Sequence, residues 1–366
     1  MLTIIIAASL AVAPVFDTVF AVETIINLPP QLNLAASPEC TYWNFCTVNP
    51  DGNGIAFIDP ASGEIQRYDF TRKGIDTVAD RGTMQRPQPG EFSEPVAAFV
   101  YNSTTVAKSG RGREQVDVPL AVNYTGSGDL LVSDLGNRRV STFAADGKLK
   151  SSFLLPSNMN SPNEMKQLPS GDYLMIGLNL DSHGAANTGT YCNLFSLDGI
   201  LLDSSLAVPS IVLSRNLWNG VAVVADIDDA GDIYAAFNVE DCLYWCGSGQ
   251  GKAERMCEPP DWFIPPPKLD PPLLFGEKPP REFPQSWTRI IRLVSDGQNR
   301  LVMAALANGR VSGISLPFVL EVYGTDGATI ASRIPSDCFP IGRDVNGSVY
   351  FLTADGKRLL KTHIRK

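Results

Sequence analysis

The sequence predicts an all-β protein built from six similar units, and three observations support this prediction. Short apolar runs rich in Val, Ile, Leu, Phe and Tyr recur along the 366 residues, without the apolar period of a helix. Turn residues separate these runs, since the chain contains 31 Gly and 27 Pro. One kind of turn recurs six times, each time between two strand-like runs. These turns are PDGN at Pro50, GSGD at Gly126, PSGD at Pro169, DAGD at Asp229, SDGQ at Ser295 and VNGS at Val345.

The spacing of the turns predicts that each unit is one blade of a β-propeller. The glycines of successive turns are 43 to 76 residues apart. A four-stranded blade takes about 40–50 residues, so the longer intervals carry insertions. A second turn follows within most units, between the third and fourth strand-like runs. It reads RKGI at Arg72, ADGK at Ala145, LDGI at Leu197, CGSGQG at Cys246 and TDGA at Thr325.

The sixth unit supplies only three strands before the C-terminus. The segment ETIINLPP, which begins at Glu23, is apolar and β-branched. We therefore expect it to close the ring as the missing fourth strand, because a closed ring leaves only short, protected sheet edges. The predicted fold is a single six-bladed β-propeller domain over residues 22–366. A seven-bladed ring and a domain split in two are the alternatives.

Residues 1–21 are predicted to form a signal peptide. The chain is apolar from Leu2 to Val15, and a Val-Phe-Ala site ends at Ala21. The segment lacks a Lys or Arg before the apolar run, and a buried N-terminal strand is the alternative. A cleaved signal peptide predicts a secreted or periplasmic protein with no membrane span left after removal of the signal.

The seven cysteines are compatible with disulfides in an exported protein. By proximity in the sequence, the candidate pairs are Cys40 with Cys46 and Cys246 with Cys257. A zinc site at Cys242, Cys246 and Cys257 is the alternative, which is disfavoured because no histidine lies near these residues.

The charge of the chain argues against nucleic acid as a partner. The formal net charge is −9 and the isoelectric point about 4.9, whereas binding to phosphates needs a basic face. The one basic cluster, KSGRGRE from Lys108 to Glu114, is predicted to be a solvated loop.

The stretch from Gly128 to Phe153 resembles an NHL repeat. In that family an apolar run is followed by Asp-x-x-Asn-x-Arg-Val, then by Phe and an Asp-Gly turn. The segment PQPGEFSEP, from Pro87 to Pro95, is similar to the connector of the same family. The resemblance implies a six-bladed propeller that serves as an interaction platform, and the acidic charge argues against the RNA-binding branch. The matching residues are Asp134, Asn137, Arg138 or Arg139, Val140, Phe143, Asp146 and Gly147.

The rim of the central tunnel is the predicted ligand site, because the innermost strands of the blades are expected to begin there. Polar and aromatic residues recur at these strand starts, and their alternative role is to cap strands and bind tunnel water. Their oxygen atoms could hold Ca²⁺, with Asn163, Glu164, Asn219 and Asp226 as candidate ligands. The predicted rim residues are Trp43, Asn44, Asn163, Glu164, Trp218, Asn219, Arg343 and Asp344.

The longest insertion spans residues 257–287 and contains ten prolines together with Trp262 and Phe263. Such an apolar segment is not expected to be wholly solvated. It either forms a lid or docking segment for a partner, or it is a strap that packs against its own blades. Another insertion, LDSHGAANTGTY from Leu180 to Tyr191, contains His183, a lone loop histidine with no accompanying acid or nucleophile pattern.

These features lead to two hypotheses about function. The first is an exported binding or scaffold propeller for an unknown protein or small molecule. The sequence contains no motif typical of an enzyme, which favours binding over catalysis. The alternative is a calcium-dependent hydrolase that resembles the gluconolactonase and paraoxonase propellers, in which Ca²⁺ polarises a carbonyl group. No cofactor is certain, and no reaction can be identified from the sequence.

Overall fold

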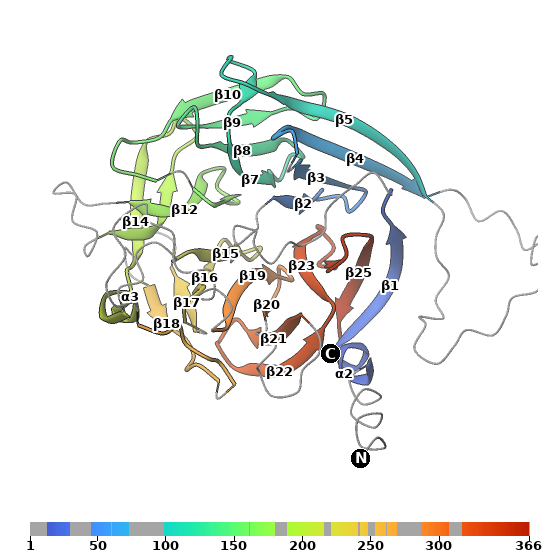
Figure 1. Cartoon of the computed structure of the whole chain (residues 1–366), viewed down its shortest axis with the longest axis vertical. Helices are drawn as coiled ribbons and strands as arrows, with labels where there is room; N and C mark the ends of the chain where they lie inside the picture. Colours follow the sequence, from blue (N-terminus) through green and yellow to red (C-terminus); the bar gives the residue numbers. More distant parts are fainter. Residues whose placement is uncertain are drawn as a thin grey trace, which may run out of the picture.

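Six β-sheets surround a central axis in the computed structural model of the protein (Figure 1). The predicted six-bladed, all-β propeller is therefore confirmed, and the seven-bladed alternative is excluded. The structure describes residues 13–29, 45–59, 61–72, 99–160, 162–179, 189–215, 221–240, 242–247, 253–260, 262–268, 287–306 and 317–365.

The first three blades each run from an inner strand to an outer strand in sequence order. Blade 1 contains β2 (Cys46–Val48), β3 (Gly54–Ile58), β4 (Ile65–Arg72) and β5 (Phe99–Ser109), with the short β6 (Gln115–Val116) added parallel to β5. Blade 2 contains β7 (Pro119–Tyr124), β8 (Leu130–Asp134), β9 (Arg139–Phe143) and β10 (Leu149–Leu154). Blade 3 contains β11 (Glu164–Gln167), β12 (Tyr173–Asn179), β13 (Thr190–Phe195) and β14 (Leu201–Ala207).

The last three blades follow the same order, except that the final strand of blade 6 comes from the N-terminus. Blade 4 contains β15 (Val223–Ile227), β16 (Ile233–Phe237), β17 (Leu243–Cys246) and β18 (Ala253–Arg255). Blade 5 contains β19 (Arg289–Ser295), β20 (Arg300–Leu306), β21 (Phe318–Gly324) and β22 (Thr329–Ser336). Blade 6 contains β23 (Cys338–Arg343), β24 (Val349–Thr353), β25 (Arg358–Ile364) and β1 (Phe20–Asn27).

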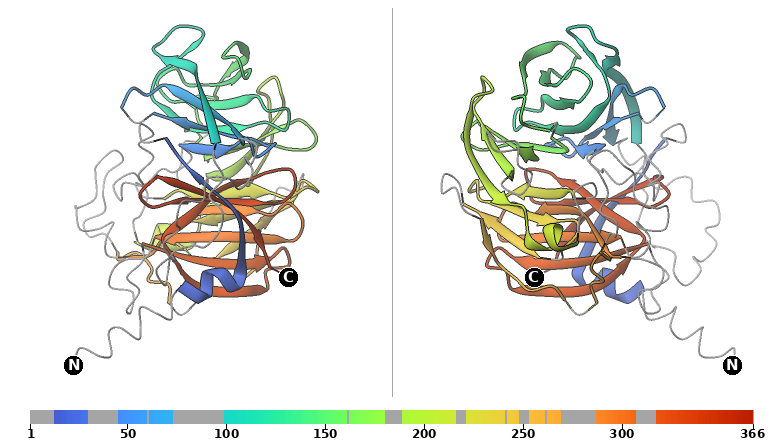
Figure 2. Two further views of the ribbon diagram at one scale, coloured as in Figure 1. Left: turned by 90° about the vertical axis from the view of Figure 1, so that its right-hand side faces the viewer. Right: turned by 60° about the vertical axis from the view of Figure 1, so that its left-hand side comes forward.

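The ring is closed by β1, which pairs antiparallel with β25 (Figures 1 and 2). This confirms the predicted closing strand, although the strand begins three residues earlier than the expected start at Glu23. A short helix, α2 (Ala13–Val19), precedes it. The residues around the predicted cleavage site, Phe20 and Ala21, lie within β1, and Phe20 is buried against Phe351. None of the described helices is long and apolar enough to cross a membrane.

The apolar core lies between neighbouring blades rather than at one centre. Each innermost strand contacts the innermost strand of the next blade, in the order β2, β7, β11, β15, β19, β23 and back to β2. The middle strands are apolar runs because both of their faces are covered by adjacent blades. The outer strands β10 and β14 are largely exposed, which explains their polar residues.

The recurring turns place a common set of loops on one side of the ring. The turn glycines adopt positive φ as predicted, for example 69° at Gly52 and 82° at Gly128. Turns of neighbouring blades touch each other, because Asp229 N–H donates to Gly297 O and Val345 N–H donates to Pro50 O. We call this side of the propeller, formed by the turns between strands one and two and between strands three and four of each blade, the turn face.

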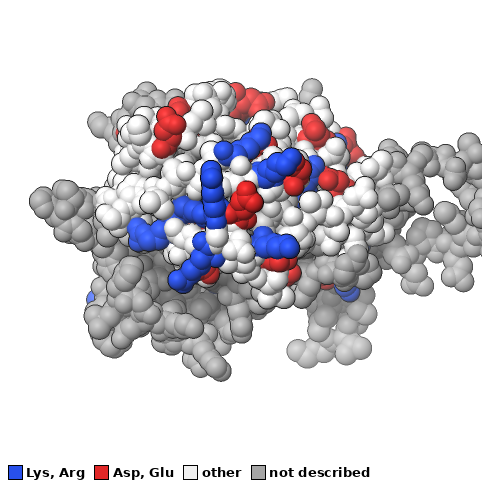
Figure 3. Space-filling model, turned by 90° about the horizontal axis from the view of Figure 1, so that it is seen from above, with Lys and Arg blue, Asp and Glu red and all other residues white. Residues whose placement is uncertain are grey.

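Charged side chains of both signs gather on the edge of the ring that blades 1 and 2 form (Figure 3). The exposed bases of the predicted solvated loop are Lys108, Arg111 and Arg113. Arg111 is paired with Asp117 at 2.8 Å, and Lys150 of β10 is paired with Asp129 at 2.7 Å. Ion pairs of this kind on a surface contribute little to stability.

Candidate functional site

The tunnel contains a network of four charged side chains, of which three are buried and the fourth, Lys166, is partly exposed. Glu164 and Lys166 come from β11, Asp226 from β15 and Arg292 from β19. Lys166 Nζ lies 3.2 Å from Asp226 Oδ1 and 3.8 Å from Glu164 Oε1, and Arg292 Nη1 lies 3.9 Å from Glu164 Oε1. Two bases therefore face two acids from three consecutive blades.

Backbone groups complete this network. Ala225 N–H donates to Glu164 Oε2 at 2.8 Å, Ser295 N–H donates to Asp226 Oδ2 at 2.9 Å, and Arg292 Nη2 donates to Cys46 O at 3.1 Å. Burial raises the pKa of the Glu164 carboxyl, while Lys166 and Arg292 oppose this rise. Burial lowers the pKa of the Arg292 guanidinium, and Glu164 opposes that change. The four charges thus stabilise one another inside the ring.

The calcium site predicted at these acids does not fit the described tunnel. Glu164 and Asp226 already face Lys166 and Arg292, so a divalent cation placed there would lie beside two positive charges. Within the described ranges, no group of three or more His, Cys, Asp or Glu side chains is arranged to hold a metal ion. Asn219, another predicted ligand, lies outside the described residues.

The predicted rim residues that the structure describes do not all meet at one place. Asn163 precedes β11 and donates from Nδ2 to Val223 O at 3.2 Å. Arg343 ends β23, so it lies at the opposite end of an inner strand from Glu164, on the turn face. Trp43, Asn44, Trp218 and Asn219 lie outside the described residues.

Asp344 closes a turn and has no free oxygen to offer a ligand. Its Oδ1 accepts hydrogen bonds from the N–H groups of Asn346 and Ser348, each at 3.0 Å. Its Oδ2 lies 2.9 Å from Lys361 Nζ and accepts from Tyr350 OH at 3.1 Å. Burial would raise the pKa of this carboxyl, but the hydrogen bonds from Lys361 and the turn amides lower it below its usual value.

The residues that resemble an NHL repeat also form a structural turn. Asp134 is fully buried, and its Oδ1 accepts from the N–H groups of Asp117 and Asn137. Its Oδ2 accepts from Asn137 Nδ2 at 2.6 Å and lies 3.5 Å from Arg139 Nε. The motif therefore joins the β8–β9 turn to the entry of blade 2. The connector from Pro87 to Pro95 lies outside the described residues.

The turn face contains a cavity of about 380 Å³ at the mouth of the tunnel. Its walls are the turns of blades 2, 3 and 4 together with Arg343 of blade 6. Arg343 Nη2 pairs with Asp229 Oδ1 at 2.7 Å across this mouth. The pair neutralises the one guanidinium that lines the cavity, so the mouth offers mainly backbone groups and turn side chains.

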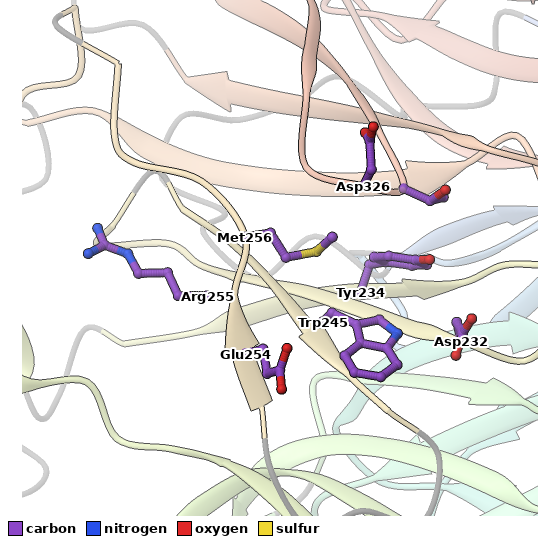
Figure 4. Close-up of a pocket in the computed structure, with 8 residues that line it drawn as sticks. Asp232, Tyr234, Trp245, Glu254, Arg255, Met256 and Asp326 are labelled. Carbon is purple, nitrogen blue, oxygen red and sulfur yellow. The ribbon is translucent and has the colours of Figure 1, made fainter.

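A second cavity of about 540 Å³ opens on the turn face between blades 4 and 5 (Figure 4). We call it the blade 4–5 pocket. Blade 4 contributes two aromatic rings, Tyr234 from β16 and Trp245 from β17, and blade 5 contributes Thr325 and Asp326 from the β21–β22 turn. The other lining residues are Asp232, Glu254, Arg255 and Met256.

The one base in this pocket is engaged elsewhere. Arg255 Nη2 lies 3.2 Å from Glu240 Oε1 and 3.1 Å from Glu258 Oε2, and its Nε donates to Cys242 Sγ at 2.8 Å. Its side chain extends away from Tyr234 and Trp245 (Figure 4). The positive charge is therefore balanced outside the pocket.

The acids of the pocket are not neutralised in this way. Within the part of the chain that the structure describes, the carboxylates of Asp232 and Glu254 have no hydrogen-bond or ion-pair partner. Asp326 accepts through Oδ1 from Ala328 N–H at 3.0 Å, which leaves its second oxygen available. Burial, together with Asp228 and Asp232, raises the pKa of Tyr234 to about 12, so its hydroxyl is neutral at physiological pH. The pocket is thus acidic and partly aromatic.

The described part of the proline-rich insertion packs against its own blades. Trp262 Nε1 donates to Glu321 Oε1 of β21 at 2.8 Å, and Phe263 is buried. Ile264 exchanges two hydrogen bonds with Thr288, at 2.9 and 3.2 Å. Residues 257–260 and 262–268 therefore match the strap interpretation, and residues 269–286 lie outside the described range, as does His183.

The cysteines come together in pairs that their spacing did not suggest. Cys246 Sγ lies 3.8 Å from Cys192 Sγ, and Cys257 lies beside Cys242, whose Sγ donates to Cys257 O at 2.7 Å. The predicted partners Cys246 and Cys257 are therefore each next to a different cysteine. The predicted partner of Cys46, Cys40, lies outside the described residues.

The fold and the tunnel define the chain as a six-bladed β-propeller with four-stranded blades. No family model matches the chain, and no curated protein matches its sequence. A solved structure of a DUF4221 family member from Bacteroides vulgatus is similar over 94% of this chain and 97% of its own, with 11% identity and a TM-score of 0.54. A protein from Bacteroides fragilis NCTC 9343, provisionally named an exported protein, covers 96% of each chain with 11% identity and a TM-score of 0.52.

A gluconolactonase from Xanthomonas campestris is similar over 94% of this chain and 97% of its own, with 9% identity and a TM-score of 0.48. At 11% identity, the two Bacteroides structures show the shared propeller fold and nothing of the activity.

The sequence interpretation missed the blade 4–5 pocket. Its residues are separated by up to 94 positions, from Asp232 to Asp326, and they meet only when two blades pack. The one signal of this pocket in the sequence was Trp245, an aromatic residue near the end of the third strand of blade 4 and directly before the predicted turn at Cys246.

Proposed function

We propose that the protein is a binding module that takes up a cationic group in the blade 4–5 pocket. The observation that carries this proposal is a pair of carboxylates, Asp232 and Glu254, which have no partner among the described residues and lie beside Trp245 and Tyr234. An ammonium or guanidinium group is attracted both by carboxylates and by the faces of aromatic rings. A partner of this class is a small organic cation or an exposed Lys or Arg side chain.

The surrounding charges support the same ligand class. Three carboxylates and one guanidinium line the pocket, and that guanidinium is paired with Glu240 and Glu258. The whole chain carries a formal charge of −9, which favours encounters with positively charged partners. Anionic ligands would meet repulsion from Asp232, Glu254 and Asp326.

The buried turn of Asp134 and Asn137 supports the further proposal that the blades are of the NHL type, which are interaction platforms. No observation among the described residues favours the calcium-dependent hydrolase. We also propose that the protein works outside the cytoplasm, as the apolar N-terminal run predicts. A fusion of residues 1–60 to alkaline phosphatase, an enzyme active only after export, tests this localisation directly.

The binding proposal is tested by calorimetric titration with matched probes. The probes are choline, arginine methyl ester and 3,3-dimethylbutanol, the last being an uncharged compound of the same shape as choline. We expect saturable binding of the two cations and none of the alcohol. Because the attraction is partly electrostatic, the affinity should fall as the salt concentration rises.

Variants locate the binding site. Trp245→Leu should abolish binding, and Asp326→Asn should weaken it about 5-fold or more, roughly 1 kcal/mol. Asp198→Asn is the matched control, because Asp198 occupies the same turn position in blade 3, away from the pocket. Equal binding of the alcohol, or equal losses in the Asp198 and Asp326 variants, would refute the proposal.

A further inference from the structure

Two buried cysteines meet at the boundary between blades 3 and 4. Cys192 lies in β13, the third strand of blade 3, and Cys246 ends β17, the third strand of blade 4. Their sulfur atoms are 3.8 Å apart, although the residues are 54 positions apart in the chain. A disulfide has a sulfur–sulfur distance of about 2.05 Å, so the two atoms need to approach by about 1.8 Å.

The surroundings of this pair are apolar. Both side chains are at most 2% exposed and belong to the core cluster that joins blades 3 and 4, together with Tyr191, Phe237 and Trp287. The neighbouring Cys246 thiol and burial raise the pKa of the Cys192 thiol. The Cys192 thiol is therefore neutral in the folded protein when it is reduced. Because both sulfur atoms are buried, reagents in solution reach them only when the chain opens or while it folds.

We propose that Cys192 and Cys246 form a disulfide bond that joins blade 3 to blade 4 when the protein folds in an oxidising environment. The oxidant is a disulfide in solution, such as oxidised glutathione or a protein disulfide. One thiolate attacks that disulfide and forms a mixed disulfide, and the second thiolate then displaces the remaining half. Two cysteine thiols and one external disulfide become one Cys192–Cys246 bond and two external thiols.

The bond would stabilise the boundary between blades 3 and 4. Among the described strands, neighbouring blades share no backbone ladder, and they are held together mainly by side-chain packing, as in the cluster around Cys192 and Cys246. A covalent link across this boundary closes a loop of more than fifty residues, which restricts the unfolded chain far more than the folded one. The inference is independent of the proposed cation binding.

The remaining thiols make the pairing specific. Cys257 is held beside Cys242, because Leu243 N–H donates to Cys257 Sγ at 3.1 Å where β17 and β18 separate. Among the described residues, the buried Cys338 has a serine hydroxyl rather than a second cysteine beside its sulfur atom, so it offers a matched control.

Peptide mapping tests the pairing. The full chain is unfolded in urea, refolded in a glutathione buffer of either oxidising or reducing composition, alkylated and digested without reduction. Refolding from urea ensures that burial does not keep the oxidant from the thiols. Chymotrypsin is added to trypsin, because cleavage after Trp245 separates Cys242 from Cys246. We expect a linked peptide pair containing Cys192 and Cys246 from the oxidising buffer and two alkylated peptides from the reducing buffer.

Thermal melting gives a second measurement. The oxidised protein should melt several degrees higher than the reduced protein, and Cys246→Ala should remove this difference. Cys338→Ala, which alters a buried cysteine outside the pair, should lower both melting temperatures and keep the difference. The proposal is overturned if the folded, oxidised protein carries alkylated Cys192 and Cys246, or if either residue is linked to another cysteine.

Discussion

At the residue scale, Asp344 illustrates how the acids of the turns serve the fold. Its carboxylate is buried, accepts from two turn amides and Tyr350, and pairs with Lys361. A Ca²⁺ ligand would need free oxygen lone pairs directed at one point, whereas these oxygens are already occupied. Asp344, which the sequence analysis predicted to be a rim ligand, therefore stabilises the turn of its own blade.

The substitution Asp344→Asn should lower the free energy of unfolding by about 2 kcal/mol, because it removes hydrogen bonds to a charged group. Since the folded pKa of Asp344 is below its usual value, its contribution is complete above that usual value and is lost as the pH falls below about 4. Urea unfolding at pH 7 and pH 3.5 measures both effects. The variant should differ less from the natural protein at the lower pH.

Asp146→Asn provides the control for this prediction. Asp146 is exposed and pairs only with the exposed Lys148. Its substitution should leave the free energy of unfolding almost unchanged. A similar loss in both variants would mean that the buried turn contacts of Asp344 do not stabilise the protein.

At the element scale, the closing strand β1 determines whether six blades make a closed ring. Phe20 packs edge-on against Phe351 of β24 and close to Phe16, with ring centroids 5.0 and 4.7 Å apart. The β1–β25 ladder joins the N-terminal strand to the last strand of the chain. Stability of the whole ring therefore depends on residues that lie close to the predicted cleavage site.

Phe20→Ala should lower the free energy of unfolding by about 3–5 kcal/mol, the usual cost of removing a buried phenyl ring. Glu23→Ala, at a half-exposed position of the same strand, is the control and should have a small effect. Denaturant unfolding checks both variants. Equal stability of the Phe20 variant and the natural protein would show that the N-terminal strand does not close the ring in solution.

Sequence patterns predicted the elements well because each depends on local chemistry. The turns at Gly52 and Gly347 need positive φ, and the apolar runs that follow need burial, so both are visible in single segments. The sites were harder to predict because they depend on contacts between blades. Sequence patterns could not predict that Cys192 lies next to Cys246 or that Arg292 lies beside Glu164, because both contacts form only when the blades pack together.

At the scale of the whole molecule, the tunnel is held by charges from three blades. Arg292 is buried against Glu164 and also donates to Cys46 O of blade 1. Removing one member of such a network leaves an unpaired buried charge. The network therefore links blades 3, 4 and 5 to one another and, through the Cys46 carbonyl, to blade 1.

Arg292→Met should lower the free energy of unfolding by about 3–5 kcal/mol, because Glu164 loses a buried partner. The double variant with Glu164→Gln should recover much of this loss, since the uncompensated carboxylate is then removed. Chemical unfolding of the single and double variants measures the coupling. Additive losses in the double variant would argue against a direct interaction between the two residues.

The ligand proposal also belongs to the whole molecule, because the pocket exists only where two blades pack. The calcium alternative places a metal in the tunnel, and the cation proposal places an organic cation on the turn face. Both ligands would bind only the folded ring, so each would raise its stability. Thermal melting with each ligand can therefore distinguish the calcium alternative from the organic-cation proposal.

The most direct test is thermal melting of one preparation with arginine methyl ester, with calcium and with EDTA. At 100 times its Kd, a ligand that binds only the folded state adds about 2.7 kcal/mol of stability. We predict a rise in melting temperature with arginine methyl ester that Trp245→Leu removes, and no change with calcium or EDTA. A rise with calcium that EDTA reverses, together with no response to arginine methyl ester, would contradict the account.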